Sequence, residues 1–269
     1  MPTVRLYQVD AFSAQLFSGN PAAVVPLEGW LDDAVLQAIA AENNVSETAF
    51  LVPSSVRDAD FELRWMTPAA EVPLCGHATL ATAWVLFNRL GWEADQVRFH
   101  SRSGPLGVTR RADGWLEMDF PNLGFESVET PDLIREAFGV VPDRAFFVPN
   151  DTNYMLVLDS EADVRQADPD LRSLKALGNQ GVIVTATGDE ADFVSRYFAP
   201  GVDVDEDPVT GSIHSVLTPY WAERQGRSAL DARQLSSRGG RLQCELRGDR
   251  VAIAGQCAFY MAGEIALPD

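Results

Sequence analysis

The stretch FELRWMTP at residues 61–68 returns as FVSRYFAP at residues 193–200. Both copies follow the pattern Phe-x-x-Arg-aromatic-x-x-Pro, and the shift from position 61 to position 193 is 132 residues, close to half of the 269-residue chain. In each copy an acid-containing loop follows the proline, then a glycine (Gly76 or Gly211), then an apolar helix that carries a histidine. Because the surroundings agree as well as the motif, the pattern favours an internal duplication over a coincidence.

A duplication of this size predicts two similar domains that contain both helices and strands. The helix expected at residues 77–90 is apolar on every side, which is typical of a buried helix. The stretch 119–131 is rich in turn residues and is the best linker, so we predict domains at residues 1–118 and 119–256. The other expected elements are strands at 4–12, 22–27, 45–52, 61–66, 154–158, 181–187 and 192–198, helices at 32–44, 131–139 and 168–178, and a hairpin at 241–255.

The composition limits the classes of partner. A net charge of −18 argues against nucleic acid or an anionic membrane as the partner, since both need a basic surface. No run of about 18 apolar residues could span a bilayer, and the N-terminal stretch MPTVRLYQVDAF lacks the features of a signal peptide. Three scattered cysteines indicate a reducing compartment rather than a disulfide framework. We therefore expect a cytoplasmic protein.

The segment DEDPVTGSIHSV at residues 205–216 gathers three carboxylates in front of a buried helix. If two domains face each other, the N-termini of both buried helices meet at one cleft and offer free N–H groups to an anion. The carboxylate of a small substrate is the simplest such anion. Asp207 is close enough to be stabilised by the helix end, whereas Asp205 and Glu206 are expected to remain in solvent.

Glu47 stands in NNVSETAF, at the start of a strand with small and apolar neighbours. A carboxylate in such a place loses part of its water, which suits a general base. The alternative is an edge-strand glutamate in solvent, which the residues alone favour.

Cys75, Gly76 and His77 are consecutive, which raises the question of a thiolate nucleophile. A cysteine just before a helix is expected to have a lowered pKa, but residues i and i+2 of a helix do not face each other, so a Cys–His pair is not expected. Thr210 stands in the second copy where Cys75 stands in the first, which argues against a racemase with two opposed thiols.

Motifs for metals and cofactors are missing from the sequence. The histidines at 77, 100 and 214 have no metal-ligand spacing, and no P-loop, GxGxxG or GxSxG motif occurs. We expect no metal and no cofactor, and we expect His214 to be a core residue held by a hydrogen bond.

The segments SGNPAAVV, SETAF, LRWMTPAAEVPLCGHATLA and RYFAPGVDVDEDPVTGSIHSVL resemble the PhzF-like family of phenazine biosynthesis, in order and over nearly the whole chain. The resemblance implies an α+β fold similar to that of diaminopimelate epimerase. In that fold each of two related domains is a barrel-like sheet around a central buried helix, and the active site lies in the cleft between them. It also implies that the strand at residues 257–269 joins the first domain, that the protein forms a homodimer, and that its reaction is a cofactor-free isomerisation. The best-understood activity of the family isomerises trans-2,3-dihydro-3-hydroxyanthranilate.

The resemblance also assigns roles to single residues. It makes Glu47 the catalytic acid and base, and it places His77 and Asp207 beside it as catalytic residues. The implied substrate-binding residues are Asn20, Gly76, His77, Gly211 and Ser212. The substrate is expected to be a small cyclic or amino-acid-like carboxylate. A racemase or epimerase with the same fold and a non-catalytic protein that binds carboxylates remain as alternatives.

Overall fold

The computed structural model describes residues 1–139, 142 and 144–268, which form two compact units. The first unit consists of Met1–Asp119 and Ala254–Asp269, and the second unit of Phe120–Ile253. Asp269, the last residue of the predicted C-terminal strand, lies outside the described residues. In the described part of the chain, the helices are too short or too polar to cross a membrane.

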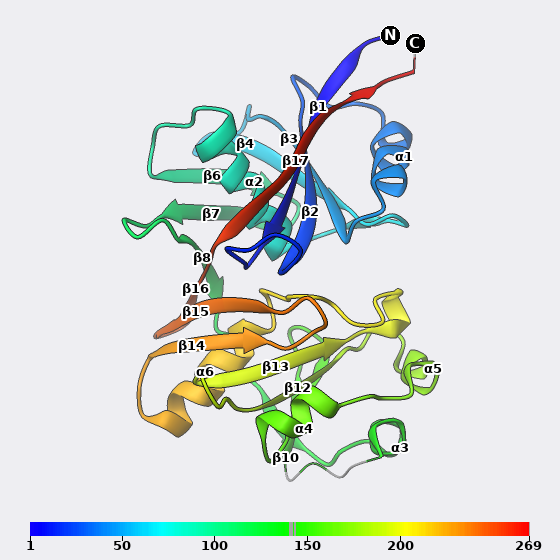
Figure 1. Ribbon diagram of the computed structural model, residues 1–269, viewed down its shortest axis with the longest axis vertical. Coiled ribbons are helices and arrows are strands. Elements are labelled where there is room, and N and C mark those ends of the chain that lie inside the picture. Colours follow the sequence, from blue (N-terminus) through cyan, green and yellow to red (C-terminus); the bar gives the residue numbers. More distant parts are fainter. Residues whose placement is uncertain (140–141, 143, 269) are drawn as a thin grey trace. The chain divides into compact units, whose positions relative to one another are not determined.

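The first unit is built around one mixed sheet (Figure 1). Its elements are β1 (Thr3–Ala11), β2 (Asn20–Pro26), α1 (Asp33–Asn43), β3 (Glu47–Pro53), β4 (Phe61–Met66), β5 (Glu71–Val72), α2 (Gly76–Arg89), β6 (Gln96–Ser101), β7 (Gly104–Arg110), β8 (Leu116–Pro121) and β17 (Cys257–Ala266).

The second unit has a similar order of elements. They are β9 (Glu126–Val128), α3 (Asp132–Phe138), β10 (Arg144–Val148), β11 (Asn153–Val157), α4 (Glu161–Gln166), α5 (Leu171–Leu174), β12 (Val182–Thr187), β13 (Phe193–Phe198), α6 (His214–Gln225), β14 (Ala229–Gln234), β15 (Gly240–Arg247) and β16 (Arg250–Gly255). Short 3-10 turns lie at Lys175–Leu177 and Pro200–Val202.

The strands of the two units follow the same sequence of directions. In the first unit β2 pairs antiparallel with β1 and parallel with β3, β4 pairs antiparallel with β3 and parallel with β6, and β7 pairs antiparallel with β6. The strands β10, β11, β12, β13, β14 and β15 repeat this order and these directions. The repeated motif found in the sequence therefore lies on strands with matching neighbours, β4 and β13.

The outermost strands also correspond. The C-terminal strand β17 runs antiparallel along β1, as Figure 1 shows, and β9 runs antiparallel along β10. The strand β9 lies inside residues 119–131, the stretch predicted as the linker. Turn residues flank Glu126–Val128, but these three residues pair with β10 and form a strand.

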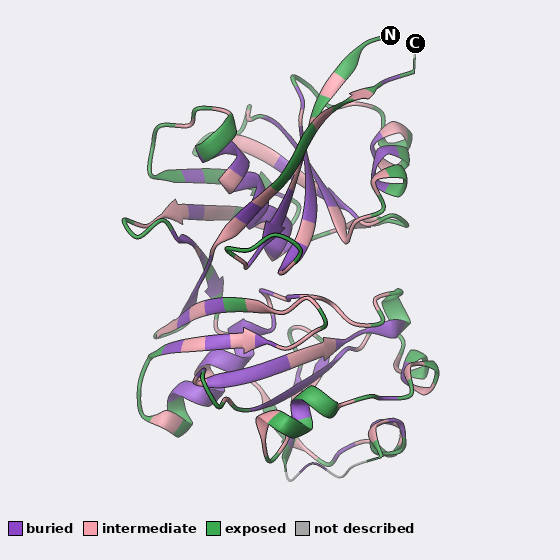
Figure 2. Ribbon diagram, in the orientation of Figure 1, coloured by how far each residue is buried: buried purple, intermediate pink, exposed green. Residues whose placement is uncertain are grey.

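Each unit has one long helix that is mostly buried (Figure 2). α2 buries ten residues, among them Leu80, Leu86 and Phe87, and it contacts strands β1, β2, β3, β7 and β17. α6 contacts β14 and β15, and the indole of Trp221 stacks on Phe193. An all-round apolar helix is stable only inside such a shell of strands. The closure of each sheet into a barrel stays a prediction.

The helix predicted after Asp168 begins later than expected. α5 starts at Leu171, and the side chain of Asp170 accepts a hydrogen bond from the Arg172 N–H. Asp170 is therefore the N-cap, because its carboxylate and not that of Asp168 reaches a free N–H group of the first turn.

Candidate active site

The carboxylate of Glu47 faces the ring of His77 in the first unit. Glu47 is the first residue of β3 and lies opposite Ala22 of β2, and its side chain is 17% exposed. His77 is the second residue of α2 and is buried. The Glu47 Oε2 and His77 Nε2 atoms are 3.1 Å apart. The structure therefore contradicts the interpretation of Glu47 as a solvated edge-strand residue.

These two atoms approach each other without the alignment of a full hydrogen bond. Both are buried, and neither has another hydrogen-bond partner among the described residues. Buried polar atoms of this kind are rare in folded proteins, and a catalytic role is one of the reasons for them. The pair is thus the strongest local sign of a functional site.

Asn20 and Ser46 orient the imidazole. The Ser46 hydroxyl donates to Asn20 Oδ1 at 2.8 Å, and Asn20 Nδ2 lies 3.2 Å from His77 Nδ1. An amide nitrogen can only donate, so Nδ1 accepts when the imidazole is neutral, and the ring proton of that form is on Nε2, on the side of Glu47. Sequence reasoning missed Ser46, although it directly precedes Glu47 in the SETAF motif.

The pKa of His77 reflects opposing influences. Burial lowers it, but the Cys75 sulfur and the Glu47 carboxylate outweigh burial and raise the pKa well above its ordinary value. His77 therefore takes up a second proton more readily than an isolated imidazole would.

Two predictions for Cys75 are wrong. Its Sγ atom lies 3.5 Å from His77 Nδ1, although residues i and i+2 of a helix do not meet. Cys75 is the N-cap of α2 and has an extended backbone (φ −145°, ψ 111°), so helical spacing does not apply to it. Burial, and then the charge of Glu47, raise the pKa of the thiol to about 11, whereas a lowered value was expected. At neutral pH Cys75 is a thiol and a weak nucleophile.

Glu47, Cys75 and His77 place three potential metal-ligand atoms within 4.8 Å of one another. The sulfur approaches Nδ1 of the ring, and the carboxylate approaches Nε2. The three residue types are ones that bind zinc, so the cluster has the composition of a metal site as well as that of an acid–base centre. The expectation of a metal-free site stays a prediction.

The other predicted residues lie in the second unit, in the turn before α6. Gly211 is buried and Ser212 is half-buried, and α6 begins after them, at His214. The carboxylate of Asp207 accepts a hydrogen bond from the Thr210 hydroxyl at 2.5 Å. The structure thus gathers Asn20, Glu47, Gly76 and His77 in one unit and Asp207, Gly211 and Ser212 in the other. The shared cleft stays a prediction.

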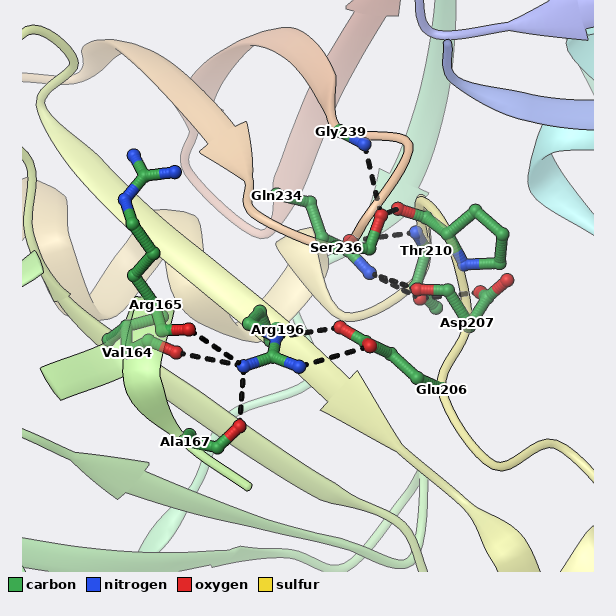
Figure 3. Close-up of polar contacts among 11 residues, drawn as sticks. Val164, Arg165, Ala167, Arg196, Glu206, Asp207, Thr210, Gln234, Ser236 and Gly239 are labelled. Atoms are coloured by element: carbon green, nitrogen blue, oxygen red, sulfur yellow. Dashed lines mark hydrogen bonds and ion pairs between the residues drawn. The ribbon is translucent and has the colours of Figure 1, made fainter. Parts of the chain in front are cut away.

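The structure corrects the expectation that Glu206 remains in solvent. Its carboxylate makes a two-pronged ion pair with Arg196, with Nε–Oε1 at 2.7 Å and Nη2–Oε2 at 3.0 Å (Figure 3). Arg196 Nη1 donates to the carbonyls of Val164, Arg165 and Ala167. Glu206 therefore fixes the loop that leads to the Gly211 turn, five residues later in the chain.

The first unit repeats this ion pair. Arg64, at the matching position of the repeated motif, binds both oxygens of Glu71 at 2.8 Å. Glu71 stands five residues before Gly76, as Glu206 does before Gly211. The arginine of the repeat is thus a structural residue that holds the loop before each glycine turn.

The position of the second unit that matches Glu47 holds a glycine. Thr48 pairs with Met66 and Val182 pairs with Phe198, so Gly181 occupies the position that matches Glu47. A Cβ atom at Gly181 would lie 2.3 Å from the Tyr197 hydroxyl oxygen, so this place has no room for a side chain. A glutamate stands at this position in one half of the duplication only.

His214 lies in the core, as predicted, with its Nδ1 atom 2.9 Å from the Thr210 carbonyl oxygen. Since a carbonyl only accepts, Nδ1–H donates. Burial lowers the pKa of His214 to about 4.

This shift predicts a loss of stability in acid. Below the unfolded pKa of about 6.5 the unfolded chain binds a proton that the folded chain refuses until about pH 4. The free energy of unfolding therefore falls over this window, by about 3 kcal/mol in full. His214→Asn, which keeps a donor near Nδ1, should lose less stability between pH 7 and pH 4.5 in urea denaturation. Equal losses in the two proteins would contradict the prediction.

The chain matches the family of phenazine biosynthesis-like proteins (PhzC-PhzF) over residues 9–263. It is 52% identical over 264 residues to an uncharacterized isomerase of Pseudomonas aeruginosa, covering 98% of this chain and 99% of that protein. It is 40% identical over 285 residues to the human phenazine biosynthesis-like domain-containing protein, covering 97% and 98% of the two chains. The crystal structure of a PhzF family protein from Enterococcus faecalis is 44% identical, with a TM-score of 0.93 over 99% of this chain and 100% of that one.

More distant structures share the fold alone. A hydroxyproline epimerase from Agrobacterium vitis has a TM-score of 0.64 at 12% identity, covering 99% of this chain and 93% of that chain. With the curated relatives named as isomerases, fold and family define an enzyme of the isomerase class. The chain belongs to the phenazine biosynthesis-like PhzC-PhzF family, which confirms the resemblance seen in its motifs.

Proposed function

We propose that this protein is a cofactor-independent isomerase that moves a proton between two positions of a small carboxylated substrate. The observation that carries this proposal is the buried pair of Glu47 Oε2 and His77 Nε2 atoms, which lack full hydrogen bonds. A carboxylate next to an imidazole, in a partly dry site, has the composition of a general acid–base centre.

In the proposed reaction Glu47 takes a proton from a substrate carbon. The electron pair of the broken C–H bond shifts along an adjacent double bond, and the proton returns from Glu47 to a second carbon. The product is an isomer, and nothing is oxidised or reduced. His77, with its Nε2 proton toward Glu47, steadies the carboxylate while it is charged.

The substrate carboxylate has a binding position at the start of α2. The first N–H groups of a helix have no acceptor within the helix and attract anions. Gly76 and His77 provide two such groups close to Glu47. Asp207, Gly211 and Ser212 keep the catalytic and substrate-binding roles that the resemblance assigns, as part of the proposal.

Heavy-water exchange tests this function. The enzyme is incubated in deuterium oxide with trans-2,3-dihydro-3-hydroxyanthranilate and then with a panel of cyclic and aromatic carboxylates, and deuterium on carbon is followed by NMR. Exchange or isomerisation of at least one carboxylate is expected. Binding of such a compound without any exchange would favour the non-catalytic alternative.

A racemase or epimerase is the second candidate, because proteins of that activity share the fold. A two-base racemase needs a base on each side of the substrate carbon. Thr210 and Gly181 stand where the second unit would repeat Cys75 and Glu47. These residues favour proton transfer by one carboxylate, and a chirality assay over a panel of amino acids separates the two functions.

Cys75→Ser is expected to keep turnover within about tenfold of the wild-type rate, since the thiol is protonated and one thiol cannot run a two-thiol mechanism. A folded but inactive Cys75→Ser protein would support the racemase.

Prolonged dialysis against EDTA should leave turnover unchanged. A loss of turnover in EDTA that one metal restores would contradict the proposal of a metal-free site.

A further inference from the structure

Gln234 lies fully buried at the end of β14 and joins three polar groups of the loop before α6 (Figure 3). Its Oε1 atom accepts from the Thr210 N–H at 2.8 Å. Its Nε2 atom donates to the Asp207 carbonyl at 2.9 Å and to Thr210 Oγ1 at 3.1 Å. An N–H partner on one side and a carbonyl partner on the other allow only this orientation of the amide.

The amide of Gln234 in turn sets the direction of the Thr210 hydroxyl. A hydroxyl has one proton, and Thr210 Oγ1 already receives a proton from Gln234 Nε2. Its own proton therefore points to Asp207 Oδ2, 2.5 Å away. The chain of donors runs from Gln234 through Thr210 to Asp207, and it ends on a carboxylate.

The chain of donors also explains why a threonine, Thr210, stands at the position that matches Cys75 of the first unit. A cysteine thiol there would be a weaker donor to the carboxylate, and valine would not donate at all. The Ser236 hydroxyl donates to the Pro208 carbonyl at 2.7 Å, so the loop between Asp207 and Thr210 is held on a second side. The arrangement leaves Asp207 little freedom to rotate.

We propose that Gln234 and Thr210 are positioning residues that hold the Asp207 carboxylate in the one orientation that suits the substrate. This inference rests on the proposed function, in which Asp207 contacts the substrate. Neither residue touches the substrate, and both act through Asp207.

The test compares Thr210→Val with Thr210→Ser. Valine keeps the shape of threonine and removes the hydroxyl, whereas serine keeps it. Losing a hydrogen bond to a charged group is expected to lower kcat/KM by about 10- to 100-fold in Thr210→Val, mainly through KM, and Thr210→Ser should recover it to within about threefold. The substrate is the carboxylate that shows exchange in heavy water, and melting temperatures verify that both variants are folded.

Gln234→Glu adds an independent variant at the start of the chain of donors. Glutamate keeps the size of glutamine but presents an acceptor to the Asp207 carbonyl, so kcat/KM should fall at pH 8. At pH 5 a protonated glutamate can donate again, and part of the loss relative to wild type at the same pH should disappear. A loss that is equal at both pH values would overturn the role of the amide as a donor.

A readout without turnover keeps this inference separate from the proposed function. In protein labelled with ¹³C at aspartate carboxyls, the Asp207 resonance is identified by its loss in Asp207→Asn. It should shift in Thr210→Val and stay in place in Thr210→Ser. An unmoved resonance together with wild-type kcat/KM in Thr210→Val would overturn the positioning role, whereas wild-type turnover in Glu47→Gln would overturn the proposed function alone.

Discussion

Replacing Glu47 with glutamine is expected to lower turnover by about 10²–10⁴-fold, the usual contribution of a positioned general acid–base group. Glutamine keeps the shape of glutamate and can still meet His77 Nε2, which lies 3.1 Å from Glu47 Oε2 in the wild-type protein. It cannot take a proton from carbon, so binding should persist while turnover falls. Deuterium exchange measured beside the binding constant of the same carboxylate separates the two effects.

Glu126→Gln is the matched control, because Glu126 is an exposed strand glutamate on β9 and has no part in the proposed site. It should exchange at the wild-type rate. If folded Glu47→Gln did so as well, Glu47 would be only a strand residue and the proposed mechanism would be wrong. Asp207→Asn should cost less in proton transfer than Glu47→Gln and should act mainly on binding.

Replacing Arg196 with methionine is expected to lower the free energy of unfolding by about 2–3 kcal/mol. The substitution leaves the carboxylate of Glu206, whose side chain is 23% exposed, without its partner. It also removes a donor from the carbonyls of Val164, Arg165 and Ala167 at the end of α4. The value is below that of a fully buried pair, because water reaches part of Glu206.

Urea denaturation measures this loss, with Arg57→Met as the control. Arg57 is almost fully exposed next to Asp58, and surface pairs of this kind contribute about 0–1 kcal/mol. Arg64→Met should behave like Arg196→Met, since Arg64 holds Glu71 in the same way. Unfolding of Arg196→Met at the same urea concentration as Arg57→Met would show that the ion pair does not hold its loop.

Much of the fold could be predicted from local patterns and from the internal repeat. The apolar stretch at 77–90, the turn at Gly248-Asp249 and the 132-residue shift from position 61 to position 193 are all visible in the sequence. They correspond to α2, the β15–β16 connection and the strands β4 and β13. Local periodicity and turn residues predict such helices and turns without knowledge of distant contacts.

The site could be predicted only as a set of residues, through the family motifs. The sequence did not indicate that Glu206 binds Arg196, that Cys75 Sγ reaches His77 Nδ1, or that burial raises the pKa of the thiol. Each of these depends on the backbone conformation and burial of one residue, which residue type and spacing leave open.

The sequence by itself indicated most of the elements and the internal duplication, and its family resemblance named the residues proposed to carry the chemistry. Only the tertiary structure decided which way the polar groups point. Ser46, Asn20 and His77 form one hydrogen-bonded series although Asn20 and His77 are 57 residues apart, and Gln234 reaches Asp207 across 27 residues. The physical reason is that hydrogen-bond direction depends on atoms that the folded chain brings together, and no short stretch of sequence contains both partners.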